Sequence, residues 1–246
     1  MLKLNTLAVA GAGIGGLATA LALGQTGVRL NVYEQAGTFT ETGAGIGLGP
    51  NAMRVLDQWG LGRELRTVGC MPEYLQSRRA DDGFIAGRLP MGQSFIEKYG
   101  APYLTVHRAD LHQILHEAVK KQDVSEFFFN YKLMAVDVQS QGLDLQFQEI
   151  NVSHQTLALI GADGLNSRVR SSVFESGAPV SSGHWAYRAL LPMSGLPQAF
   201  QKSHVGIWMG KRLHVVHYPV RGGEFLNMVV LVETTDHPSQ AGWDVL

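Results

Sequence analysis

The chain of 246 residues has one cysteine, Cys70, so neither an internal disulfide nor a multi-cysteine zinc or iron–sulfur site is possible. Charged residues are scarce at 17%, against about 25% in an average soluble domain. The 20 Lys and Arg nearly balance the 21 Asp and Glu, which leaves a formal charge of −1. This balance argues against a nucleic-acid partner and against a basic membrane-binding patch. A lone cysteine is compatible with a reducing compartment, and we expect a cytoplasmic protein.

Charge is missing altogether between Lys3 and Arg29. An uncharged stretch of this length is long enough to be a membrane span or a signal peptide, since about 20 apolar residues cross a bilayer. Glycines interrupt it, however, and neither a signal-type basic cluster nor a cleavage region accompanies it. We therefore expect no membrane segment here.

Glycine is abundant instead, with 29 residues, thirteen of them within the first 62. Gly11, Gly13 and Gly16 form a G-x-G-x-x-G motif, to which Gly15 adds a fourth glycine. In such a motif the first glycine permits a tight turn, the second admits a pyrophosphate, and the third lets a helix pack on a strand. A glycine-rich turn without a ligand is the alternative.

The context of the motif favours dinucleotide binding. Residues 4–10 have the pattern of a buried strand, 15–25 that of an apolar helix, and 30–34 that of a second strand. This βαβ unit ends at Glu34, 18 residues after Gly16. A carboxylate there can accept hydrogen bonds from a ribose diol and repels a 2′-phosphate, which indicates FAD or NAD rather than NADP.

Three further segments stand out, around Pro50, Arg108 and Asp163; they read GAGIGLGPNAMRVLDQWGLG at 43–62, HRADLHQIL at 107–115 and LALIGADGLNSRVR at 157–170. Arg108 directly precedes a helical pattern, where its guanidinium could pair with a phosphate and Asp110 could cap the helix. A local Arg108–Asp110 pair is the alternative. Asp163 and Gly164 follow a predicted strand at 157–160 and precede a short basic helix, and an ordinary turn is the alternative there.

In this order the four segments resemble the single-component FAD-dependent aromatic hydroxylases, the para-hydroxybenzoate hydroxylase-like family, and within it the salicylate and hydroxynicotinate monooxygenase branch. The resemblance implies an α/β fold in which a Rossmann-type FAD-binding domain is interleaved with an antiparallel-sheet substrate domain. It also implies hydroxylation of a small aromatic acid, with FAD as cofactor and NAD(P)H and O₂ as co-substrates.

The resemblance also assigns cofactor residues. The Arg matching Arg108 contacts the flavin nucleotide in the family, and the Asp-Gly segment lies near the pyrophosphate and helps NAD(P)H engage. The implied cofactor-binding set is Gly11, Gly13, Gly15, Gly16, Glu34, Gln35, Arg108, Asp163 and Gly164.

We expect an FAD-binding domain at 1–175, with a substrate-side excursion around 72–100, and a partial substrate domain at 176–246. Alternating patterns predict antiparallel strands within 132–160 and again from about 180.

Candidate substrate-contacting residues in the second domain are His214, His217 and Tyr218, of which His214 and Tyr218 are our catalytic candidates. A base among them would deprotonate a phenol and activate the ring. The alternative is that they merely lie on one face of a strand. The same branch can carry a His in the GAGI segment, where this chain has Gly47.

The sequence also allows other interpretations. His112 and His116 have the i,i+4 spacing of a metal pair on a helix, but no third ligand is evident, so we expect solvated histidines and no metal. An NAD-dependent dehydrogenase is disfavoured by the Asp-Gly segment. The family's third FAD segment, a Gly-Asp motif followed by a helix, is not found after residue 232. The sequence therefore predicts a C-terminally truncated relative, with a catalytically inactive FAD-binding remnant as the alternative.

Overall fold

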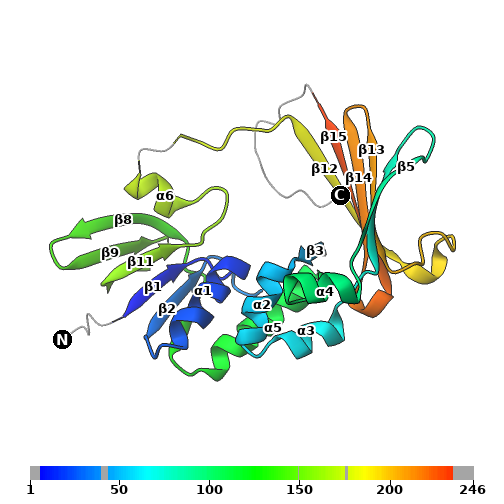
Figure 1. The fold of residues 1–246 in the computed structure, drawn as a ribbon. Coiled ribbons are helices and arrows are strands. Elements are labelled where there is room, and N and C mark those ends of the chain that lie inside the picture. Colours follow the sequence, from blue (N-terminus) through cyan, green and yellow to red (C-terminus); the bar gives the residue numbers. More distant parts are fainter. Residues whose placement is uncertain (1–5, 40–43, 149, 175–176, 235–246) are drawn as a thin grey trace. The chain divides into compact units, whose positions relative to one another are not determined.

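The structure is a computed structural model that describes residues 6–39, 44–148, 150–174 and 177–234 (Figure 1). Internal contacts divide the chain into two compact units, each built from two segments. Unit 1 comprises residues 1–41 and 112–180, and unit 2 comprises 42–111 and 181–246. Within the described residues, no helix combines the length and the apolar character that crossing a bilayer requires.

Unit 1 is built on the predicted βαβ unit. A four-stranded parallel sheet has the order β11-β1-β2-β7. Its strands are β1 (Leu7–Ala10), β2 (Leu30–Glu34), β7 (Ser125–Phe129) and β11 (Ala158–Gly161). Helix α1 (Ile14–Gly24) joins β1 to β2, and its buried residues, Leu17 among them, lie toward these strands. The predicted elements at 15–25 and 30–34 are thus confirmed within one residue, whereas residues 4 and 5 lie outside the described range.

An antiparallel sheet completes unit 1. It has the order β10-β9-β8, with strands β8 (Leu133–Gln139), β9 (Gly142–Phe147) and β10 (Ile150–Thr156), as the alternation within 132–160 predicts. The prediction of antiparallel strands is wrong at the end of that range, because β11 pairs in parallel with β1. A hydrophobic core in unit 1 centres on Tyr33 of β2. The centroid of its ring lies 5.0 Å from that of Phe128 and 4.6 Å from that of Phe147. The Tyr33 hydroxyl is hydrogen-bonded to Nδ1 of His154 at 2.9 Å. Burial raises the pKa of Tyr33 to about 12.

Two further helices contribute residues to unit 1. Helix α5 (Arg108–Lys121) begins in unit 2 and ends in unit 1. Helix α6 (Arg168–Val173) follows the Asp-Gly segment and extends past the predicted basic stretch.

Unit 2 is built on a six-stranded sheet of order β12-β15-β14-β13-β4-β5. Its strands are β4 (Tyr74–Arg79), β5 (Ile85–Pro90), β12 (His184–Pro192), β13 (His204–Gly210), β14 (Leu213–Val220) and β15 (Phe225–Glu233). All neighbours are antiparallel except β13 and β4. The strand patterns from residue 180 onward are confirmed.

Smaller elements complete unit 2. A two-stranded ladder pairs β3 (Gly45–Leu48) with β6 (Leu104–His107). The helices are α2 (Pro50–Gln58), α3 (Gly62–Val68) and α4 (Gln93–Tyr99), with one-turn 3₁₀ helices at Met193–Gly195 and Arg221–Gly223. Helix α2 starts at Pro50 as predicted and buries Met53 and Leu56.

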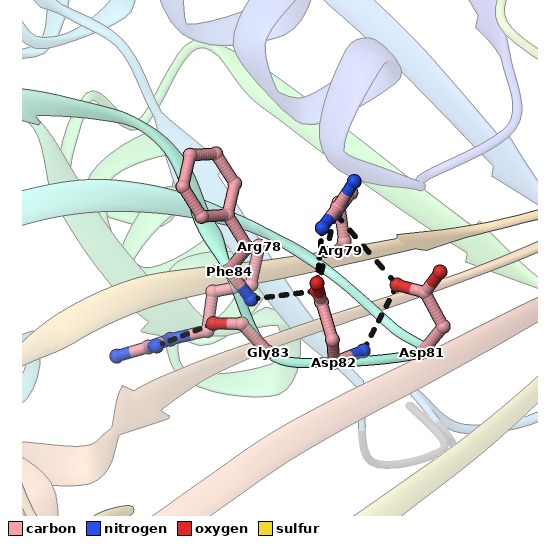
Figure 2. A network of polar contacts seen from close by, with 6 residues as sticks. All are labelled: Arg78, Arg79, Asp81, Asp82, Gly83 and Phe84. Atoms are coloured by element: carbon pink, nitrogen blue, oxygen red, sulfur yellow. Dashed lines mark hydrogen bonds and ion pairs between the residues drawn. The ribbon is translucent and has the colours of Figure 1, made fainter.

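The turn between β4 and β5 gathers four charged residues (Figure 2). The Asp82 carboxylate accepts a hydrogen bond from the N–H of Phe84 at 3.0 Å and pairs with Arg79. Arg78 instead donates to the carbonyl of Gly83 at 3.0 Å. The Arg79 guanidinium is the main reason that the pKa of Asp82 lies below its usual range. These charges close an exposed hairpin.

The boundaries of the two compact units differ from those of the domains expected from the sequence. The whole segment 42–111 groups with 181–246, whereas the sequence suggested an excursion around 72–100 only. The physical reason is strand pairing, because β4 adds in parallel to β13 and Gly45 of β3 bonds to Asn227 of β15. Functional domains and contact-based units need not coincide, so the domain assignment stays a prediction.

Candidate functional site

The glycine-rich loop connects β1 to α1, and two of its glycines are required by packing. Gly11 has φ +95°, and a side chain there would overlap the backbone of Ala162. A side chain at Gly16 would overlap the carbonyl of Gly11. These are the tight turn and the close helix–strand approach that the motif predicts.

The other two glycines leave space instead. A Cβ atom at Gly13 or at Gly15 would have no protein atom within 4 Å apart from its chain neighbours and the backbone of its own helix. Gly13 is the N-cap residue of α1, and the first helical turn carries no acidic residue. A helix N-terminus presents N–H groups without intrahelical partners and a partial positive charge, so this open space suits an anion.

Glu34 lies at the end of β2 and contacts the loop directly. Its Oε2 accepts a hydrogen bond from the N–H of Ala12, and its Oε1 accepts one from the N–H of Ala36, both at 2.9 Å. A carboxylate can accept about four hydrogen bonds, so both oxygens retain acceptor capacity. Gln35 follows as an exposed residue.

Asp163 and Gly164 lie beside the same loop. The N–H of Ala162 donates to the carbonyl of Ala10 at 2.8 Å. The Asp163 carboxylate accepts from the Ser167 hydroxyl at 2.6 Å and from the N–H of Arg168 at 2.6 Å. Ser167 is the N-cap of α6, and Asp163 accepts from the first N–H groups of that helix, so its described bonds lie within the loop and the helix start. Unit 1 thus brings together the glycine-rich loop, Glu34 and the Asp-Gly segment.

Arg108 is the first residue of α5, and the neighbouring Asp110 does not have the capping role expected of it. The N–H of Arg108 donates to the carbonyl of Ala44 at 2.8 Å, and burial, with a contribution from Arg188, lowers the pKa of its guanidinium. Asp110 is not the N-cap, because it lies inside the first turn of the helix. Its carboxylate instead receives two hydrogen bonds from Arg221, at 3.0 and 3.2 Å.

His214 and Tyr218 share one face of β14, because strand residues an even number apart point the same way. Burial raises the pKa of Tyr218 to about 12, so its phenol stays protonated and can donate. The Tyr218 ring occupies the space that a side chain at Gly45 would need. His214 is half-buried.

His217 lies on the opposite face and has a structural environment. Its side chain is 2% exposed, Trp208 donates to its Nε2 at 3.2 Å, and its ring lies 5.3 Å from that of His204. Burial lowers the pKa of His217 to about 4, so it is neutral at pH 7. The structure thus separates His217 from His214 and Tyr218.

No sequence signal points to the roles of Asn227 and Tyr103, and the expectation for His112 is wrong. Asn227 is fully buried and its Oδ1 accepts from the N–H of Gly45 at 2.7 Å. The hydroxyl of Tyr103 fills the space beside Gly47, and burial raises the pKa of that phenol. His112 is 4% exposed and bonded to the carbonyl of Ala12 at 2.7 Å, so the expectation of a solvated histidine is wrong.

His112 and His116, the two histidines with the spacing of a metal pair, both have other contacts. His112 uses its Nε2 for a backbone carbonyl, and His116 packs edge-on against Phe39 and Phe127. In the part of the chain that the structure describes, no three His, Cys, Asp or Glu side chains gather as metal ligands would.

Comparison with known proteins gives the family. Residues 3–245 match the family described as FAD binding domain. The chain belongs to this family. A relative from Polaromonas naphthalenivorans (strain CJ2), named 3-hydroxybenzoate 6-hydroxylase, is 39% identical over 234 residues, which cover 95% of this chain and 58% of that protein. A 6-hydroxynicotinate 3-monooxygenase from Bordetella bronchiseptica is 38% identical over 186 residues, or 76% of this chain and 48% of that protein.

Solved structures agree on the fold of this family member. Klebsiella pneumoniae HpxO complexed with FAD and uric acid superimposes with a TM-score of 0.81 at 23% identity, covering 96% of this chain and 58% of that one. The predicted α/β, Rossmann-type class with antiparallel sheets is confirmed. The chain spans about three-fifths of the length of the first relative that it matches.

Proposed function

We propose that unit 1 holds the adenosine-diphosphate half of FAD and that the protein serves in the hydroxylation of a small aromatic acid with NAD(P)H and O₂. The observation that carries the proposal is the open space at Gly13 and Gly15, at the N-terminus of α1 and beside the Glu34 carboxylate. The relatives' names supply the reaction class, since they act on hydroxybenzoate and hydroxynicotinate.

The residues present fit the cofactor. The N-terminus of α1 offers N–H groups to a pyrophosphate and has no acidic residue in its first turn, and Glu34 retains acceptor capacity for a ribose diol. Gln35, Asp163 and Gly164 would border the same site. Arg108 belongs to unit 2, and its contact with the flavin nucleotide stays a prediction. Reduced FAD, when bound, would supply the chemistry that transfers an oxygen atom from O₂.

The substrate side is proposed for unit 2. Tyr218 would donate a hydrogen bond from a phenol that stays protonated, and His214 would accept the proton of a ring hydroxyl. Losing that proton makes the ring a better nucleophile. The substrate class is a hydroxylated aromatic acid, and the cellular location that we propose is the cytoplasm.

A second function is favoured by one observation. The chain spans about three-fifths of the length of a full relative, so this polypeptide by itself could bind FAD without catalysing hydroxylation. The two functions differ in one quantity, the product formed per NAD(P)H consumed.

Titration of the purified chain with FAD and with ADP tests the nucleotide site, and we expect saturable binding of both. If the chain binds neither FAD nor ADP, the proposal is contradicted. Incubation with FAD, NAD(P)H and a panel of hydroxylated aromatic acids then separates the two functions. Product formed in proportion to NAD(P)H supports the hydroxylase, whereas NAD(P)H consumption without product supports an FAD-binding protein that does not hydroxylate.

A further inference from the structure

The peptide units around Ala12, in the middle of the glycine-rich loop, are held by side chains from two other elements. The N–H of Ala12 donates to Oε2 of Glu34 at 2.9 Å, from the end of β2. Its carbonyl is hydrogen-bonded to Nε2 of His112 at 2.7 Å, from α5. His112 is one hundred residues away in sequence and lies in the same compact unit.

The chemistry of the carbonyl fixes the direction of this bond. A carbonyl oxygen only accepts, so Nε2 of His112 must carry a proton and donate it. In a planar trans peptide the C=O of one residue and the N–H of the next point in opposite directions. The bond therefore directs the N–H of Gly13 away from His112. Because linked hydrogen bonds polarise one another, it also makes that N–H a stronger donor.

The imidazole itself is held in place. His112 is 4% exposed, and the ring of Phe39 meets it edge-on with 4.6 Å between centroids. Phe39 also packs against His116 at 4.6 Å and Phe129 at 5.0 Å. A donor fixed by such packing orients its acceptor at little entropic cost, because few rotamers remain to be lost.

We propose that His112 is a positioning residue for dinucleotide binding, which orients and polarises the Ala12–Gly13 peptide so that the Gly13 N–H faces the pyrophosphate. The inference rests on the proposed function of unit 1. It also explains the H-x-x-x-H spacing as one buried donor and one packing partner.

Substitution at this position tests the inference in the full chain. His112→Leu keeps the volume but removes the donor, His112→Gln keeps an N–H at similar reach, and His116→Leu is the matched control on the same helix. We expect His112→Leu to weaken ADP and FAD binding about ten-fold, the equivalent of one hydrogen bond. His112→Gln should stay within about three-fold of the parent, and His116→Leu should match it.

Two readouts separate positioning from general structure. Adenosine lacks the pyrophosphate, so its affinity should change far less than that of ADP in His112→Leu. In the ligand-free chain, the amide resonance of Gly13 should shift in His112→Leu and remain near its parental position in His112→Gln. Should the Leu variant not fold, His112→Asn, which is too short to reach the carbonyl, serves in its place with the same expected loss.

The outcomes are distinct. If the parent binds ADP and His112→Leu binds it equally well, the inference fails while the proposed function stands. Equal losses for adenosine and ADP, or equal losses in the Leu and Gln variants, also overturn it. If the parent binds neither ADP nor FAD, the proposed function fails and the inference fails with it.

Discussion

The glycines of the loop fall into two physical classes, which substitution separates. Gly11 and Gly16 are enclosed by backbone atoms, whereas Gly13 and Gly15 border open space. The first class serves the fold and the second leaves room for a ligand. A binding assay combined with an unfolding assay can therefore tell them apart one residue at a time.

Gly13→Val should abolish dinucleotide binding and leave the fold intact. The backbone at Gly13 has φ −69° and ψ −177°, which valine adopts readily, and an added Cβ would have no protein atom other than its chain neighbours within 4 Å. A poorer N-cap should cost under about 1 kcal/mol of stability. Gly16→Val is the control and should unfold the chain, because its Cβ overlaps the Gly11 carbonyl. ADP titration and thermal unfolding measure both; stoichiometric ADP binding by Gly13→Val would refute the assignment.

Glu34→Ala should weaken FAD binding by about 1.5–3 kcal/mol, the range for hydrogen bonds to a charged group. The structure adds an effect on stability, since the N–H groups of Ala12 and Ala36 both lose their acceptor. Glu126→Ala, at an exposed position of β7, is the matched control and should change neither quantity. Unchanged flavin affinity on titration of Glu34→Ala would contradict the ribose assignment.

His217 should make stability depend on pH. Its pKa is about 4 in the folded chain and about 6.5 when unfolded, so the unfolded state binds the proton more readily between these values. Its stabilising contribution is complete above about pH 6.5 and is lost as the pH falls toward 4. His217→Gln, which keeps an acceptor for Trp208, should reduce the stability lost between about pH 7 and 4.5 by on the order of 2 kcal/mol.

Urea unfolding at several pH values measures this dependence. His184→Gln, at the exposed start of β12, is the control and should keep the parental slope. If the unfolding free energy of His217→Gln depends on pH as steeply as that of the parent, groups other than His217 cause the loss of stability at acid pH.

At the scale of elements, strand β3 relies on glycine to lie against two tyrosines. Tyr218 fills the space at Gly45, and the Tyr103 hydroxyl fills the space at Gly47. The sequence contains these glycines, but their partners are 56 and more residues away and no local pattern identifies them. The strand is thus a packing surface for side chains of other elements.

Gly47→Ala should destabilise the chain by about 1–3 kcal/mol, because the added methyl group meets the Tyr103 hydroxyl. Tyr103→Phe removes that oxygen, so the double variant should recover part of the loss. Unfolding free energies of the parent, both single variants and the double variant measure the coupling. Additive effects would show that Tyr103 moves aside without cost.

At the scale of the whole molecule, sequence patterns predicted what is local. The G-x-G-x-x-G loop, its flanking strand and helix, and Glu34 at the end of β2 follow from short-range spacing and are confirmed as structure. Pairings across long separations could not be predicted. The His112 bond to Ala12, the parallel pairing of β4 with β13, and the burial of Asn227 against Gly45 depend on how distant segments meet.

The candidate cofactor-binding residues of unit 1 lead to a prediction about the relative affinities of FAD and ADP. Gly11 to Gly16 and Glu34 address the adenosine-diphosphate half, so ADP should bind within about ten-fold of FAD. Competition titration of ADP against FAD measures the ratio. FAD binding more than about a hundred-fold tighter than ADP would mean that residues outside this set grip the flavin ring.

The division into two units also separates the chromophores of the protein. Residues 1–41 and 112–180 contain no tryptophan, because all four tryptophans of the sequence belong to the segments 42–111 and 181–246 of unit 2. Tryptophan emission therefore comes from residues of unit 2. Unit 1 has its own optical signature, because Tyr33 is packed among Phe128, Tyr131 and Phe147. Near-ultraviolet circular dichroism of that cluster is the signal in which nucleotide-induced tightening of unit 1 should be followed.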